Sequence, residues 1–394
     1  MQRLLVIDGF RGFFLLFMAV AHYDGLIGSW LGKLHHKNFG WVEDAQGFVF
    51  LSGLVVGLVY GRKYLRRPAL GAIAGPILAR VRTIYAHQAG LVAILLAAAL
   101  ALGPLAAPDL APFLEAPVTF TASSLLLVSS ASNMGILPMY VFFLLATPFA
   151  LRALHRGQVA PFFAAIVLCW LAAQSNLAGM AMHQLQLALN GQGIPARFGL
   201  YFNLLAWQAL FFTGLYVGYR QAEGRIDLGF LHAPQWRTVF FMGLAAVALL
   251  GLHDLMVQMR LLGTDYSTRI LIRSDRAILG TIYPIAFAVD LFLVVWLLRV
   301  GPEDRSAWVR RASAAVGWVF TRRWLTVLGQ HSLHVFSFHI LVFYALATAM
   351  PMLALDQWGR AAVLIGSVGS LYLAAWGHAW MQAREASGRR AATA

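Results

Sequence analysis

The first apolar stretch of the chain carries three ionisable side chains whose types suit acid–base and anion-binding chemistry. Asp8, Arg11 and His22 interrupt a run of otherwise mostly apolar residues. At about 100° per residue, Arg11 and His22 fall on nearly the same face of a helix, roughly 16 Å apart along its axis. Asp8 precedes Arg11 by one turn and can pair with it. This stripe suits a long ligand with anionic groups at one end and a reactive carbonyl at the other.

Two plainer explanations of the same stretch stay open. Arg11 can extend to the lipid headgroups while His22 is a hydrogen-bonded packing residue. Arg3, the apolar run and the small residues at 19–21 also resemble a cleavable signal peptide. Asp8 and Arg11 would interrupt the apolar region of such a peptide, and hydrophobicity continues beyond the small residues. We therefore favour a membrane helix that is not cleaved off and that retains Arg11 and His22.

Two carboxylates begin the second apolar stretch. Glu43 and Asp44 lie on the side of the membrane toward which His22 is expected to lie. A carboxylate can orient an imidazole and raise its basicity, so either residue is a candidate catalytic partner of His22. The alternative is compensation of the helix dipole by acidic residues at a helix start. Within the same stretch, we expect Ser52 and Gly53 to allow close helix packing.

Composition places these residues in a membrane protein. Of the 394 residues, 60% are hydrophobic and 12% charged, against about 45–50% and about 25% in soluble domains. We predict an all-α, polytopic integral membrane protein that forms a single membrane-embedded domain over residues 1–394. The ten predicted transmembrane helices cover residues 8–31, 43–60, 86–104, 137–152, 160–178, 199–219, 237–255, 278–298, 332–350 and 361–381.

The basic residues predict the orientation. The net charge of +14 comes largely from Lys and Arg clustered between apolar spans, which indicates cytoplasmic loops rather than a nucleic-acid partner. Both termini are then cytoplasmic, and we expect the inner membrane of a bacterium. The outer segment 257–277 is also basic. It either faces an anionic substrate or pairs with its own aspartates.

A basic cluster precedes the third span at the expected cytoplasmic surface. Arg80, Arg82 and Tyr85 lie together there, and arginine suits bidentate phosphate contacts. The alternative is the ordinary excess of positive charge on the inner side.

Polar and aromatic residues gather in the expected outer segments. Such surfaces suit sugars, and they also suit any membrane–water boundary. The candidates for substrate binding are Asn203, Trp207, Gln208, His253 and Asp254.

No metal or nucleotide motif stands out. His331, His334 and His339 lie within nine residues but do not share one helical face, so we predict no metal site and keep His339 as an intramembrane polar contact. No Gly-rich phosphate loop with a following Lys is present, which disfavours an ATP-driven pump.

Several motifs together resemble the membrane acyltransferase-3 superfamily. Asp8-x-x-Arg11-Gly with His22 resembles its Arg-x10-His signature. The segment 48–53, Phe-Val-Phe-Leu-Ser-Gly, resembles its Phe-rich second helix, and 80–85 its Arg-rich motif. Gly329-x-x-Ser332 followed by His339 resembles its late Gly-x-x-Ser…His motif.

Within that superfamily, the chain is most similar to the OpgC branch, which succinylates osmoregulated periplasmic glucans. The similar segments are residues 38–41, 48–61, 136–140 and 202–208. One departure concerns the acidic segment of that branch, where this chain has Glu43 and then Gln46. The second carboxylate is therefore missing or replaced by Asp44.

The resemblance implies an acyl-coenzyme A donor, expected to be succinyl-CoA, and a glucan or other envelope carbohydrate as acceptor. Arg11, Arg80 and Arg82 would hold the coenzyme A phosphates, and His22 would act as general base on the sugar hydroxyl. We expect direct transfer, with a His-bound acyl intermediate as the other route. The competing class is a secondary transporter or flippase. Such transporters often contain two corresponding helices broken by Gly or Pro, and this sequence shows no such pair.

Overall fold

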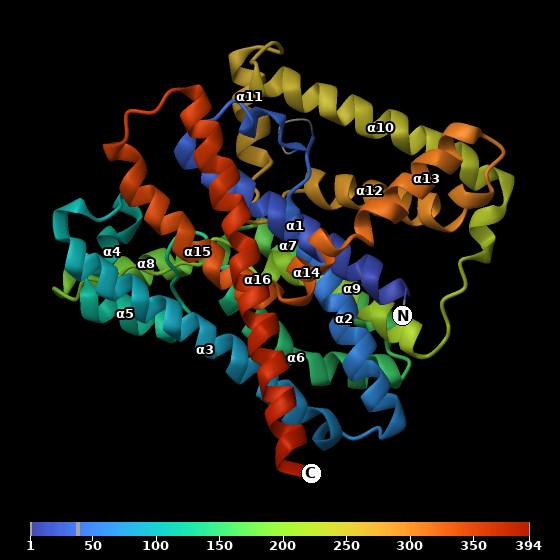
Figure 1. Cartoon of the computed structure of the whole chain (residues 1–394), viewed down its shortest axis with the longest axis horizontal. Coiled ribbons are helices and arrows are strands. Elements are labelled where there is room, and N and C mark those ends of the chain that lie inside the picture. The colour runs from blue at the N-terminus through green and yellow to red at the C-terminus, as the bar shows by residue number, and fades with distance from the viewer. Residues whose placement is uncertain (1, 37–39, 394) are drawn as a thin grey trace. The chain divides into compact units, whose positions relative to one another are not determined.

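Helices form all the regular structure of the computed structural model, which describes residues 2–36 and 40–393 (Figure 1). The longer elements are α1 (Gln2–Ile27), α2 (Asp44–Arg66), α3 (Leu70–Leu102), α4 (Ala111–Glu115), α5 (Pro117–Leu125), α6 (Ile136–His155), α7 (Val159–Gln174), α8 (Leu177–Gly191), α9 (Leu204–Ala222), α10 (Pro234–Gln258), α11 (Thr264–Arg273), α12 (Ile282–Arg299), α13 (Ala307–Phe320), α14 (Arg323–Gln330), α15 (Ser332–Ala349) and α16 (Gln357–Thr393). This confirms the all-α prediction.

Eight helices of the described part are long and apolar enough to cross a membrane. A ninth span results if α7 and α8, which meet at a bend of 51°, count as one. The sequence predicted ten. The difference lies mainly in α9, which matches the predicted span 199–219 but is not among these helices. Its sequence includes the polar side chains Gln208, Arg220 and Gln221.

Contacts divide the chain into two units. Unit 1 comprises Met1–Phe48, Asp227–Thr268 and Ile285–Ala394, and unit 2 comprises Val49–Ile226 and Arg269–Pro284. Helix α2 begins in unit 1 and continues in unit 2. The prediction that residues 1–394 form a single domain stays a prediction.

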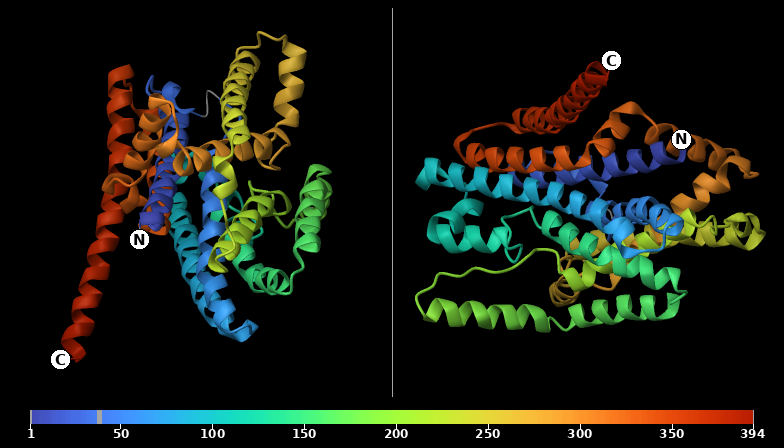
Figure 2. Two further views of the ribbon diagram at one scale, coloured as in Figure 1. Left: turned by 90° about the vertical axis from the view of Figure 1, so that its right-hand side faces the viewer. Right: turned by 90° about the horizontal axis from the view of Figure 1, so that it is seen from below.

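Helix α1 lies at the centre of unit 1. It packs most extensively against α14 and also contacts α13, α15 and α16 (Figure 1). Glycines make the α1–α14 contact close: a Cβ at Gly12 would collide with the carbonyl of Leu325, and one at Gly329 with the carbonyl of Asp8. Small residues let membrane helices approach at the backbone. This packing fixes the position of the α1 residues, along the helix axis, relative to α14 and α15. Helix α16 continues well past these neighbours toward its C-terminal end (Figure 2).

Gly329→Ala should lower the melting temperature of the detergent-solubilised protein, because the added methyl group meets backbone atoms that cannot move aside. Overpacking of this kind costs about 1–3 kcal/mol. The matched control is Gly366→Ala in α16, where nothing lies within 4 Å of the added atom; there, the helix propensity of alanine should leave stability unchanged or raise it. A thermal melt that shifts equally in both variants would contradict the close α1–α14 packing.

A second apolar cluster in unit 1 joins α10 to α12 and α13. Phe240 of α10 stacks on Trp296 of α12 with ring centroids 4.2 Å apart, and Val309 of α13 is buried in the same cluster. Arg237 donates to the buried carboxylate of Asp304 at 2.8 Å. Removing one member of a buried ion pair typically costs about 3–5 kcal/mol, so this pair fixes the segment that leads into α13.

Unit 2 contains a similar glycine-mediated contact. A Cβ at Gly53 of α2 would collide with the carbonyl of Phe211 in α9, and one at Gly214 of α9 with the carbonyl of Phe50. The expectation that Gly53 allows close helix packing is therefore confirmed. Helix α3 packs along α6, and α7 along α9.

Candidate functional site

Arg11 is anchored by a serine of another helix. Its Nη2 donates to Oγ of Ser332, the first residue of α15, at 2.7 Å. The carboxylate of Asp8, one turn earlier, lies 3.9 Å from Nη1. A half-buried guanidinium held between a hydroxyl and a carboxylate has a fixed orientation, whereas an arginine that only extended to the lipid headgroups would need neither partner.

His22 is hydrogen-bonded to a second histidine. Its Nδ1 lies 2.8 Å from Nε2 of His339 in α15, and the two rings are nearly parallel with centroids 5.1 Å apart. His339 is completely buried, and its Nδ1 lies 3.1 Å from the carbonyl oxygen of Phe336. The hydroxyl of Tyr23 donates to the backbone carbonyl of His339 at 3.3 Å. The pair therefore joins α1 to α15 inside the bundle of unit 1.

The hydrogen bonds assign the tautomers of both histidines. A carbonyl oxygen only accepts, so Nδ1 of His339 carries the proton and its Nε2 is the acceptor. Nδ1 of His22 must then donate to it. When both rings are neutral, Nε2 of His22 is the nitrogen with the lone pair. That nitrogen can take a proton, which is the requirement for a general base.

The expected carboxylate partners of His22 make other contacts. Asp44 lies between His35 and His36, whose Nε2 atoms are 3.4 and 3.1 Å from its carboxylate oxygens. The backbone N–H of Glu43 donates to the side-chain oxygen of Gln46 at 2.9 Å. The ring that orients His22 through Nδ1 is His339. A catalytic role for Glu43 or Asp44 stays a prediction.

The basic cluster expected to bind phosphates lies in unit 2. Arg80 and Arg82 are exposed on α3, and the hydroxyl of Tyr85 donates to the carbonyl of Leu125 at 3.1 Å. Two exposed arginines fit a phosphate contact and equally fit the ordinary positive charge of a cytoplasmic surface. A cavity of ≈ 480 Å³ in the same unit is lined by the basic side chains Arg152, His155 and Arg156.

Three of the expected sugar-binding residues make hydrogen bonds within unit 2. Asn203 caps α9 by accepting from the N–H groups of Leu205 and Ala206. The buried indole of Trp207 donates to the carbonyl of Ala277 at 3.1 Å, and Gln208 donates to the carbonyl of Ile166 at 2.9 Å. These hydrogen bonds explain the residue types without a ligand, and their contact with a sugar stays a prediction.

The other two sugar-binding candidates lie in unit 1. Nε2 of His253 lies 3.0 Å from the hydroxyl of Tyr266, and its ring lies 5.9 Å from that of Trp41. Asp254 is buried and accepts from Gln258 at 2.8 Å. Their contact with a substrate likewise stays a prediction.

Two of the three late histidines share one partner, and the third has another. His331 lies 2.8 Å from His378 of α16, and His334 stacks on the same ring. His339 turns instead toward His22. Both histidines stood out in the sequence, His22 as a candidate base and His339 as a polar contact in an apolar span. No sequence pattern indicated that they pair.

The family model described as OpgC protein matches residues 3–383. The chain belongs to the OpgC family. No curated protein and no solved structure matches it significantly. Membership indicates a membrane acyltransferase that modifies glucans, and the match extends over both units.

For an OpgC protein, unit 1 contains two side-chain types that suit acyl transfer. Nε2 of His22 can take a proton, and the guanidinium of Arg11 lies roughly 16 Å away along α1. Ser332 and His339, which position these two side chains, both belong to the late Gly-x-x-Ser…His motif. These two motif residues lie seven positions apart on α15, about 10 Å along its axis, and each contacts one of the two side chains of α1.

Proposed function

We propose that this OpgC-family protein transfers a succinyl group from cytoplasmic succinyl-CoA to hydroxyl groups of a periplasmic glucan, in the inner membrane of a bacterium and with both termini cytoplasmic. The observation that carries the proposal is the His22–His339 pair inside an apolar bundle. Ionisable groups are costly there and mark functional sites.

The reaction needs one proton acceptor and one activated acyl group. Nε2 of His22 removes the proton of a glucan hydroxyl as the oxygen attacks the thioester carbonyl. The carbon–sulfur bond then breaks, the thiolate takes the proton back from His22, and an ester and free coenzyme A remain. The thioester is already activated, so direct transfer within a ternary complex needs no acyl-enzyme.

The anionic end of the donor needs fixed cations. Arg11 is oriented by Ser332 and Asp8, so its guanidinium is pre-positioned for a phosphate or carboxylate oxygen. Arg80 and Arg82 are separate candidates for the phosphates of coenzyme A because they are exposed. No metal is required by this route.

The test is reconstitution of the purified protein in proteoliposomes that contain radiolabelled succinyl-CoA, with glucan outside. We expect labelled ester on the external glucan and free coenzyme A inside. Unmodified glucan together with movement of an unaltered solute across the bilayer would instead identify the rival class, a transporter or flippase.

Arg11→Ala should raise the KM for the acyl-CoA donor by roughly 10- to 100-fold, because a charge-assisted hydrogen bond to the donor is worth about 1.5–3 kcal/mol. Arg11→Lys should restore part of the affinity, since it keeps the charge but loses the planar fork. Steady-state kinetics with varied donor measure both effects. An unchanged donor KM in the alanine variant would remove Arg11 from donor binding.

A further inference from the structure

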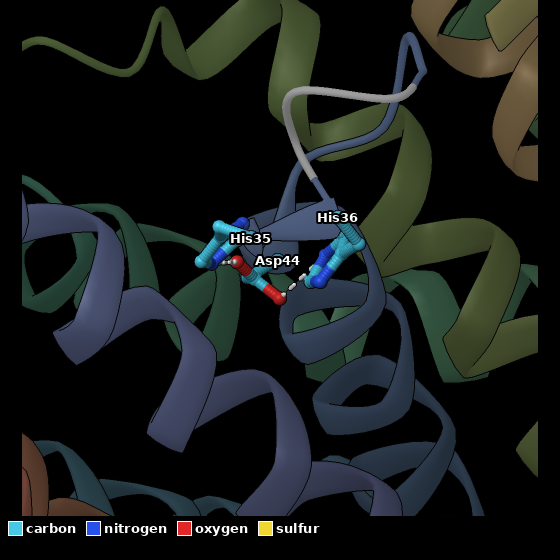
Figure 3. A group of neighbouring side chains, drawn as sticks. All are labelled: His35, His36 and Asp44. Atoms are coloured by element: carbon cyan, nitrogen blue, oxygen red, sulfur yellow. Dashed lines mark ion pairs between the residues drawn. The ribbon is translucent and has the colours of Figure 1, made fainter. Parts of the chain in front are cut away.

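A buried cluster of two histidines and one aspartate lies outside the site described above. His35 and His36 follow the short helical turn Gly32–Leu34 after α1, and Asp44 is the first residue of α2. Figure 3 shows the carboxylate of Asp44 between the two imidazole rings. One nitrogen of each histidine and one carboxylate oxygen all lie within 4.8 Å of one another.

The burial of the cluster makes its hydrogen bonding informative. The side chains of His35 and Asp44 are 1% and 6% exposed, and that of His36 is 35% exposed. Among the described residues, no donor makes a well-aligned hydrogen bond to Oδ1 of Asp44, although Nε2 of His36 lies only 3.1 Å away. This oxygen therefore keeps a lone pair that can bind a cation placed between the three groups.

The distances fit a small divalent ion. Zinc binds imidazole nitrogen and carboxylate oxygen at about 2.0–2.2 Å, so neighbouring ligand atoms of a tetrahedral site lie about 3.4 Å apart. Nε2 of His35 lies 3.4 Å from one carboxylate oxygen of Asp44, and Nε2 of His36 lies 3.1 Å from the other, both close to that separation. Two imidazoles and one carboxylate are also a donor set that suits zinc and its neighbours in the first transition row.

The surroundings hold the ligands in place. The ring of Phe17 meets that of His35 edge-on, and the ring of Phe13 lies over that of His36. The carbonyl oxygen of Phe17 lies 2.8 Å from Nε2 of His35, where it accepts the proton that this nitrogen carries without an ion. Metal binding must displace that proton, so the affinity should fall as the pH falls.

We propose that His35, His36 and Asp44 bind one Zn²⁺ ion, or a neighbouring divalent transition-metal ion, and fasten the segment after α1 to the start of α2. Three protein ligands leave a fourth position, and the partial exposure of His36 places that position within reach of solvent. The sequence predicted no metal site, since the adjacent pair His35 and His36, with Asp44 eight residues later, matches no common metal-binding motif. The inference does not depend on the acyl-transfer proposal.

The experiment uses the full-length protein in detergent, stripped of metal with a chelator and titrated with Zn²⁺ against a chromophoric competitor. We expect one equivalent of zinc in the wild type. His36→Ala and Asp44→Asn should each weaken binding by at least roughly 10-fold, which is the lower end of losses seen even for residues that only support metal ligands. Co²⁺ in place of Zn²⁺ should give the visible absorption of a four-coordinate site.

Matched controls separate this site from adventitious binding. His183→Ala and Asp265→Asn remove an exposed histidine and an exposed aspartate, and both should keep the full equivalent. His36→Ala is the decisive variant. Because the side chain of His36 is partly exposed, the protein should still fold without it. Wild-type protein that takes up no zinc, or a folded His36→Ala variant that retains it with unchanged affinity, would overturn the proposal.

Discussion

His22→Ala should lower the rate of acyl transfer by roughly 10²- to 10⁴-fold, the usual contribution of a positioned general base. The loss should appear in kcat, because His22 acts on the acceptor hydroxyl and lies about 16 Å along α1 from the cation that we assign to the donor. The measurement is release of free coenzyme A together with mass spectrometry of the glucan, at equal amounts of protein in the membrane.

The control for this variant is His232→Ala, which removes an exposed histidine after unit 1 resumes at Asp227. It should leave the rate unchanged. If the His22→Ala protein inserts, accumulates and still modifies the glucan at the wild-type rate, His22 is not the base.

Changing His339 to leucine should lower kcat by about 10²-fold, less than the roughly 10⁴-fold loss that follows removal of the charged orienting group of a serine-protease triad, because His339 is neutral. Without its Nε2, nothing in the pair holds the proton on Nδ1 of His22. The donor KM should stay the same, since Arg11 keeps its contact with Ser332. His339→Gln should recover part of the rate, because an amide oxygen can also accept from Nδ1.

This variant has an internal comparison on the same helix. His334→Leu removes a histidine that stacks on His378 instead of contacting His22, and it should leave kcat unchanged. An equal loss in His334→Leu and His339→Leu would show that α15 needs both side chains for packing. It would count against a positioning role for His339.

Composition and periodicity alone are enough to assign the class of the protein and to select α1 as the helix with the candidate catalytic residues. Continuous apolar runs can satisfy their backbone hydrogen bonds in a bilayer only as helices, so composition and length predict the all-α membrane architecture directly. The same reasoning makes Arg11 and His22 conspicuous, because each is costly in an apolar run. Their common face follows from helical periodicity alone.

The side chains that contact Arg11 and His22 follow from the packing of distant helices. His339 and Ser332 are more than 300 residues away from their partners along the chain. No local sequence pattern predicts that the close packing of α1 on α14, at their glycines, places α15 beside α1. Asp44 is an example of a residue whose contacts could not be predicted from its position in the sequence. Its position beside an expected base suggested a partner for His22, but the turn after α1 directs His35 and His36 to it instead. Local periodicity fixes the face on which a side chain lies, whereas its partner depends on long-range packing that single-helix patterns do not encode.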